Sequence, residues 1–233
     1  MEQNLSKKTR TESDLIGSRE VPESALYGVQ TLRGIENFRI SKFHLNEYPL
    51  FIQALAITKM GAAVANRELD LLTEEQADAI LKACKEILEG KHHDQFPVDM
   101  IQGGAGTTTN MNANEVIANR ALELMGHQRG EYQYCSPNDH VNRSQSTNDA
   151  YPTAIHIGLY YTHLKLVKHF EVLIESFRKK ATEFAHVIKM GRTQLEDAVP
   201  MTLGQTFNGF ASILWHEVKN LDFAAQDFLT VNM

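Results

Sequence analysis

The sequence has little cysteine, and the two it contains are far apart. Cys84 and Cys135 form no Cys-x-x-Cys pair within the 233 residues. Two distant cysteines are too few for a disulfide scaffold and do not match the common zinc or redox motifs. We therefore interpret both as ordinary thiols.

Long apolar runs and basic clusters are also missing. No run of about 18 apolar residues, the length that spans a membrane, occurs in the chain, and Met1–Arg10 has no apolar core of a signal peptide. The formal net charge is −6, from 23 basic and 29 acidic residues. This balance argues against nucleic acid or an anionic membrane as the main partner. We expect a cytoplasmic protein whose partner is a small molecule or another copy of itself.

The first half of the chain predicts a small mixed region. Residues 12–40, including Tyr27-Gly28-Val29-Gln30-Thr31, favour short strands or extended loops. Apolar residues with small alanines predict a helix over 49–69. The capping-box pattern Thr73-Glu74-Glu75-Gln76 predicts a second helix that ends at Gly90.

The second half predicts two long helices. Apolar residues at three- or four-residue spacing run from about 152 to 185 and resume from 203 to 228, with a donor-rich loop over 189–200 between them. Each helix has a wide apolar stripe, and two helices cannot bury such stripes against each other alone. We expect further helices from outside this chain to cover them.

The polar stretch Asn138–Thr153 is the first candidate site. Ser146, Thr147 and Asn148 precede Asp149 and Pro152, which are signals for the start of a helix. Side-chain donors beside the free N–H groups of a helix N-terminus can hold a carboxylate. The alternative is a simple capped turn, because these residue types favour such turns for local reasons.

Two other motifs have residues that could bind a ligand. The glycine-rich loop 102–106 leads into Thr107 and a helix, but it lacks the Gly-Lys-Ser/Thr ending of a phosphate-binding loop, and no buried strand precedes it. It remains a second place where donors could meet an anion. His92-His93-Asp94 carries metal-ligand chemistry, but adjacent residues beside a helix end rarely converge on one ion. We interpret it as a solvated loop.

Three donor-rich blocks, each beside a helix end, resemble the aspartase/fumarase superfamily, and the likeness extends from Val21 through Gln205. The blocks are Gly103-Gly104-Ala105-Gly106-Thr107 with Asn110-Met111-Asn112-Ala113-Asn114-Glu115, Ser144-Gln145-Ser146-Thr147-Asn148-Asp149, and Gly191-Arg192-Thr193-Gln194 with Asp197-Ala198-Val199-Pro200. Their order along the chain makes the resemblance more specific than any single motif. The second block, with Ala150-Tyr151-Pro152, is most similar to the aspartate ammonia-lyase branch.

The resemblance implies a reversible elimination of ammonia from L-aspartate to give fumarate, through a carboxylate-stabilised carbanion and without an organic cofactor. Carried over by position, Thr107, Ser146 and Thr147 would hold a substrate carboxylate. Asn148 would lie near the amino group, and Thr193 would contact the other carboxylate. Gln194, a further substrate contact, stands where fumarases and some aspartases have histidine, so this chain lacks a titratable group there.

The resemblance also implies a fold and an assembly. It predicts a mainly α protein, with a small mixed N-terminal domain over 1–145 followed by the first two long helices of an aspartase/fumarase-type bundle over 146–233. The family forms homotetramers. Nothing in residues 1–233 resembles its Gly-Ser-Ser-x-Met-Pro-x-Lys-x-Asn-Pro loop, which carries the general-base serine. We therefore expect no catalytic base here, an N-terminal portion of the enzyme, and no activity from it alone.

Two alternatives remain open at this point. One is a class II fumarase, which would form fumarate from malate. The other is a non-catalytic scaffold protein that shares the fold. A divalent metal activates some aspartases, but the sequence shows no ligand cluster from which to assign a metal site.

Overall fold

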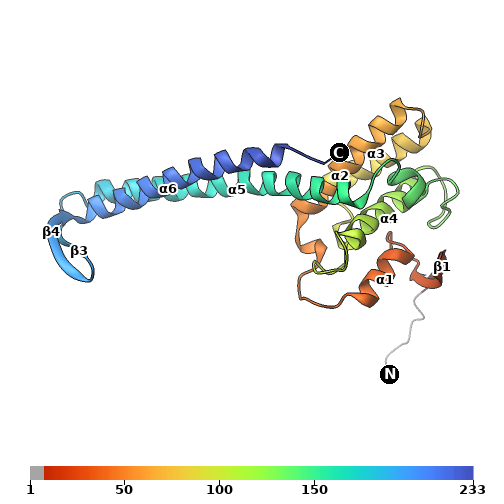
Figure 1. The fold of residues 1–233 in the computed structure, drawn as a ribbon, viewed down its shortest axis with the longest axis horizontal. Coiled ribbons are helices and arrows are strands. Elements are labelled where there is room, and N and C mark those ends of the chain that lie inside the picture. The colour runs from red at the N-terminus through yellow and green to blue at the C-terminus, as the bar shows by residue number, and fades with distance from the viewer. Residues whose placement is uncertain (1–7, 233) are drawn as a thin grey trace, which may run out of the picture. The chain divides into compact units, whose positions relative to one another are not determined.

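The computed structural model describes residues 8–232. It is mainly helical, as predicted, and contains two small antiparallel sheets. The described residues form two compact units. The first contains residues 8–158 and 231–232, and the second is Leu159–Thr230. In chain order the elements are β1 (Thr9–Asp14), β2 (Gly17–Pro22), α1 (Val29–Asn37), the 3-10 turn Leu45–Glu47, α2 (Pro49–Glu68), α3 (Glu74–Leu88), the 3-10 turn His93–Gln95, α4 (Thr107–Leu124), the π-helical turn Pro137–Val141, α5 (Thr147–Glu183), β3 (Ile188–Thr193), β4 (Glu196–Thr202), α6 (Leu203–Ala225) and the 3-10 turn Gln226–Leu229 (Figure 1).

The core of the first unit lies between α2, α3 and α4. The two helices expected over 49–69 and after Thr73 are confirmed, and Thr73 and Gln76 form the predicted capping box at the start of α3. Small and branched side chains fill the contact between the three helices. The fully buried members include Ile52, Leu55, Ala77, Ile80, Ala113, Ile117 and Leu122.

The prediction of extended structure over residues 29–31 is wrong, because Val29–Asn37 forms α1. Its N-terminus is capped from distant positions. Glu115 on α4 accepts the backbone N–H groups of Gly28, Gln30 and Thr31 at 2.8, 2.8 and 3.0 Å. Burial raises the pKa of the Glu115 carboxyl, and these hydrogen bonds oppose that rise. The helix thus depends on a tertiary contact that local sequence patterns do not contain.

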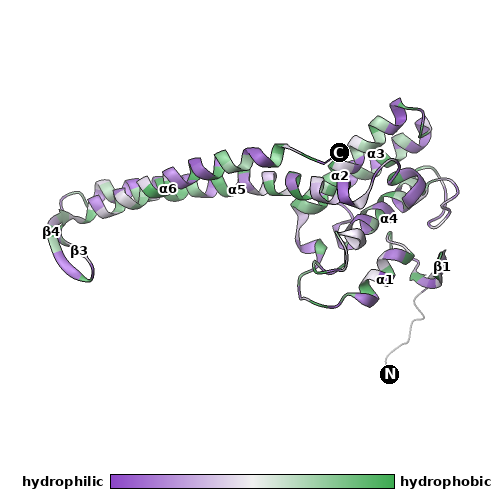
Figure 2. Ribbon diagram, viewed as in Figure 1, coloured by the Kyte–Doolittle hydropathy of each residue, from purple (hydrophilic) through white to green (hydrophobic). Residues whose placement is uncertain are grey.

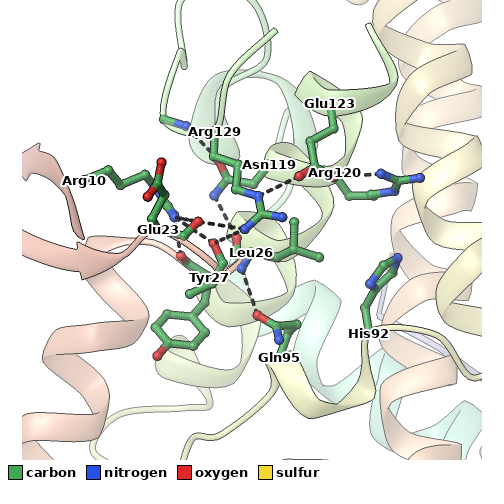
Figure 3. Close-up of polar contacts among 12 residues, drawn as sticks. Arg10, Glu23, Leu26, Tyr27, His92, Gln95, Asn119, Arg120, Glu123 and Arg129 are labelled. Carbon is green, nitrogen blue, oxygen red and sulfur yellow. Dashed lines mark hydrogen bonds and ion pairs between the residues drawn. The ribbon is translucent and has the colours of Figure 1, made fainter. Parts of the chain in front are cut away.

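Two arginines fix the turn over residues 23–27 that leads into α1 (Figure 3). Arg10 donates to the carbonyl oxygen of Tyr27 at 2.8 Å. Arg129 donates to that of Glu23, also at 2.8 Å, and its Nε donates to Glu123 at 2.6 Å. These carbonyl oxygens lie outside the sheet, so the two arginine side chains supply their hydrogen-bond donors. The turn is therefore held between β1 and the residues that follow α4.

The second unit is an antiparallel helix pair, formed by α5 from Leu159 and by α6. The ring of Phe177 on α5 lies 6.0 and 5.6 Å, centroid to centroid, from those of Phe207 and Phe210 on α6. Apolar residues recur along both helices (Figure 2), and many stay exposed. Among the described residues, no helix is long and apolar enough to cross a membrane.

The donor-rich loop predicted over 189–200 is instead a β-hairpin made of β3 and β4. Thr193 pairs with Glu196, so Gln194 and Leu195 form the turn, with φ of 50° and 68°. Two-residue hairpin turns of this hand usually contain asparagine or glycine. Because both turn residues here are of other types, the usual sequence signal of a hairpin is missing.

Candidate functional site

The predicted helix start in the second block is confirmed, because α5 begins at Thr147. The Ser146 backbone N–H donates to Asp149 Oδ2 at 2.9 Å, and the Asn148 N–H donates to Ser146 Oγ at 3.2 Å. Ser146 and Asn148 are exposed, and Thr147 is half-buried. The segment is therefore a capped helix start that also presents polar side chains to solvent.

The N-terminus of α4 lies against the first turns of α5. Gly106 precedes Thr107 with φ of +85°, and a Cβ at this glycine would overlap the ring of Tyr151 on α5. Thr107 is exposed. The first turn of α4 has no side-chain cap at Gly106 and no acidic residue. Its positive end therefore faces outward beside the start of α5 without a compensating carboxylate.

The glycine-rich loop before α4 is held by two side chains at its N-terminal end, those of Asp99 and Gln102. Gln102 accepts the Thr109 N–H at 2.8 Å and donates to the Thr109 hydroxyl at 2.8 Å. Asp99 accepts the N–H groups of Ser41 and Ile101 at 2.6 and 2.8 Å. The Ser41 N–H, with the other donors around this carboxyl, lowers the pKa of Asp99 to about 2. The position of Thr107 is thus set by a braced loop.

A buried polar network lies beneath the start of α5. Asn110 on α4 donates to Thr147 Oγ1 at 3.2 Å and to Asn142 Oδ1 at 3.1 Å. Lys59 Nζ on α2 donates to Asn142 Oδ1 and to Gln145 Oε1, both at 2.9 Å. The network therefore joins α2, α4 and the segment that leads into Ser146 and Thr147.

Lys59 is the residue of this region that the sequence interpretation missed. Its side chain is fully buried, and desolvation lowers its pKa to about 7. A signal was present, since position 59 falls on the apolar stripe of α2 at helical spacing. The stripe consists of Ile52, Leu55, Ala56 and Ala63.

The predicted site residues are divided between the two units. Thr107, Ser146, Thr147 and Asn148 belong to the first unit, where the contacts of α4 with α5 bring them to adjacent helix starts. Thr193 and Gln194 belong to the second unit, where they are exposed at the tip of the β3–β4 hairpin. Their predicted roles toward substrate stay predictions.

The two histidines that follow α3 contact the last turn of that helix. His92 Nε2 lies 3.1 Å from Glu86 Oε2, and His93 Nε2 lies 2.8 Å from the Ile87 carbonyl oxygen. Over residues 8–232, no three His, Cys, Asp or Glu side chains gather in a way that could hold a metal ion.

The adjacent starts of α4 and α5 are suited to binding an anion. The side chains at these two helix starts present hydroxyl and amide donors, and a buried lysine lies below the start of α5. Donors that carry no basic group can stabilise a carboxylate, and a more highly charged intermediate formed from it, without competing for its proton. The arrangement is suited to a carboxylate whose negative charge increases during reaction.

Comparison with known proteins identifies the family. The model of a family described as "Lyase" matches residues 17–232. The chain belongs to this lyase family. It is 55% identical over 230 residues to the aspartate ammonia-lyase of Escherichia coli strain K12, and 57% identical over 221 residues to that of Pseudomonas fluorescens. These alignments cover 98% and 95% of this chain but 48% and 46% of the relatives. The resemblance to aspartate ammonia-lyases is thus confirmed, and the chain spans about half their length.

Solved structures of this lyase family share the fold. A structure described as a fumarate lyase:delta crystallin from Brucella melitensis superposes with a TM-score of 0.95 at 50% identity, over 97% of this chain and 53% of that one. The class II fumarase of Schistosoma mansoni superposes with a TM-score of 0.87 at 36% identity, over 96% and 47% of the two chains. Both alignments include nearly all of this chain.

Proposed function

We propose that the protein containing this chain is an aspartate ammonia-lyase, which converts L-aspartate reversibly to fumarate and ammonia. The observation that carries the proposal is the pair of adjacent helix starts, α4 with glycine at its N-cap and an exposed Thr107, and α5 with exposed polar side chains. It is supported by the identity to aspartate ammonia-lyases, 55% or more, against 36% to the class II fumarase.

The roles follow from the chemistry of the elimination. Loss of a proton from the carbon next to a carboxylate places a second negative charge on the carboxylate oxygens. Donors directed at that charge lower the barrier, and removal of one typically slows catalysis by about 10²- to 10³-fold. We assign Thr107, Ser146 and Thr147 to this carboxylate and Asn148 to the amino group. Thr193 is assigned to the other carboxylate, and Gln194 is a further substrate contact.

Self-association is the second part of the proposal. Large apolar side chains remain exposed on the helix pair, with Val172 at 68%, Ile213 at 61% and Phe223 at 83% of their full accessible area. Such a surface marks an interaction site in a folded protein. We propose that copies of this chain cover it in a cytoplasmic homotetramer. Size-exclusion chromatography with light scattering on the complete protein tests this, and a monomer would contradict it.

The activity is tested on the complete protein with L-aspartate and with L-malate, by following the ultraviolet absorbance of fumarate. We expect fumarate from aspartate. Formation from malate alone would favour the class II fumarase, and no product from either substrate would favour the scaffold alternative. In the same assay we expect residues 1–233 alone to be inactive, because they contain no segment similar to the serine loop of the family.

A variant pair tests the assigned donors. Ser146→Ala removes an exposed hydroxyl, and we expect kcat/KM for aspartate to fall by about 10²-fold or more. Ser176→Ala is the matched control, since that hydroxyl donates to the carbonyl of Val172 in the C-terminal part of α5, within the second unit. Equal activity of the two variants would contradict the assignment of Ser146.

A further inference from the structure

The network below the start of α5 contains a buried cation without a buried anion. Lys59 is 0% exposed, and its ammonium donates to two neutral amide oxygens, those of Asn142 and Gln145. Within residues 8–232, no carboxylate forms an ion pair with it. The Cys84 thiol, which shares its electrostatic environment, is also neutral, because burial raises its pKa to about 12. A charge buried in this way destabilises a fold unless something compensates it.

Short links connect this cation to the start of α5. Hydrogen bonds of 2.9, 3.1 and 3.2 Å lead from Lys59 through Asn142 and Asn110 to the hydroxyl of Thr147. The ammonium nitrogen is therefore within about 9 Å of that hydroxyl, a distance at which Coulomb interactions inside a protein are still appreciable.

The two amides that hold Lys59 also shape the chain that precedes Ser146. Asn142 Nδ2 donates to the Gln145 carbonyl oxygen at 3.0 Å, and Gln145 Nε2 donates to that of Val141 at 3.0 Å. Each amide uses its oxygen for the ammonium and its nitrogen for the backbone. The orientation of the turn and the position of the charge are thus set together.

We propose that Lys59 is a positioning residue for dicarboxylate binding, whose buried ammonium orients Asn142 and Gln145 beneath Ser146 and Thr147 and supplies positive charge that the bound carboxylate compensates. The proposal rests on the proposed function and deepens it. Lys59 does not touch the substrate. It acts through the network and through the field of its charge.

The expected size of the effect follows from the distance. A carboxylate that accepts a hydrogen bond from the Thr147 hydroxyl lies up to about 12 Å from the ammonium nitrogen. In its protonated form, Lys59 carries one unit of charge, which at about 9–12 Å and an effective dielectric constant of about 20 changes affinity by roughly 10- to 20-fold. A neutral replacement of similar shape should lose that factor. So should a change that keeps Lys59 but places an anion next to it.

The test uses the complete protein, and succinate is the probe because it is a dicarboxylate with no amino group to eliminate. Turnover of L-aspartate by the unaltered protein is measured first, and its absence would reject the proposed function. Succinate binding is then measured by calorimetry, which does not depend on turnover. This separates failure of the Lys59 proposal from failure of the proposed function.

Two variants change the charge and a third is the matched control. We expect Lys59→Met and Asn142→Asp each to weaken succinate binding by roughly tenfold, the first by removing the cation and the second by pairing it. Asn142→Asp also removes one amide donor from the turn. Asn66→Ala removes such a donor too, the 2.9 Å hydrogen bond to the Arg143 carbonyl, without changing charge. We expect it to weaken binding by less than about threefold.

Asn142→Asp decides the matter if Lys59→Met does not fold, since it retains the lysine and gives it a counterion. Weaker succinate binding by Asn142→Asp than by Asn66→Ala supports the proposal, and so does a loss that diminishes at high salt. Succinate binding by Asn142→Asp equal to that of the unaltered protein overturns it, as does an equal loss in Asn66→Ala. No binding of succinate by the unaltered protein overturns it as well.

Discussion

Gly106→Ala probes the contact that places the two helix starts together. Gly106 has φ of +85°, where a residue with a Cβ is disfavoured by about 1–2 kcal/mol. Its added Cβ would also overlap the Tyr151 ring, and overpacking of this kind costs about 1–3 kcal/mol. We therefore expect the free energy of unfolding to fall by about 2–5 kcal/mol, measured by urea denaturation of the complete protein.

Gly126→Ala is the matched control for backbone strain. Gly126 has φ of +84°, and a Cβ there would meet nothing within 4 Å. It should lose only the strain of about 1–2 kcal/mol. In a double-mutant cycle, Tyr151→Ala should reduce the loss of unfolding free energy that Gly106→Ala causes, because the ring that the new Cβ overlaps is gone. Equal destabilisation by the two alanine variants would refute the reasoning that the Tyr151 ring requires a glycine.

Three further predictions concern other contacts of the first unit. Glu115→Gln, which weakens the cap on α1, should lower the free energy of unfolding by about 1–3 kcal/mol in urea denaturation, and an unchanged midpoint would contradict the cap. The hydrogen bond from Arg120 lowers the pKa of Glu86 from 4.5 to about 2, so this pair stabilises the fold above about pH 4.5 and loses its effect as pH falls toward 2. Melting temperatures of Glu86→Gln and the unaltered protein should therefore differ most near neutral pH and converge in acid; a constant difference would count against this. Gln102→Ala should loosen the glycine-rich loop and raise KM for aspartate in the fumarate assay, whereas an unaltered KM would show that the brace is dispensable.

Much of the secondary structure was predictable because it depends on local patterns. The helices α2 and α3 follow apolar periodicity and a capping box, and the starts of α4 and α5 follow glycine and cap residues beside Thr107 and Thr147. The helix α1 and the β3–β4 hairpin were not predicted. The first is capped by Glu115, 84 residues or more away in sequence, and the second turns through Gln194 and Leu195, which lack the usual turn chemistry.

By itself, the sequence determined the mainly helical class, the helix starts that carry Thr107, Ser146, Thr147 and Asn148, and the resemblance to the lyase family. Those features are encoded within a few residues of one another or in the order of motifs. Only the tertiary structure showed that α4 and α5 begin side by side and that an unpaired ammonium, Lys59, is buried beneath α5. Both depend on contacts between segments distant in sequence, because burial and the distance between charges are set by packing.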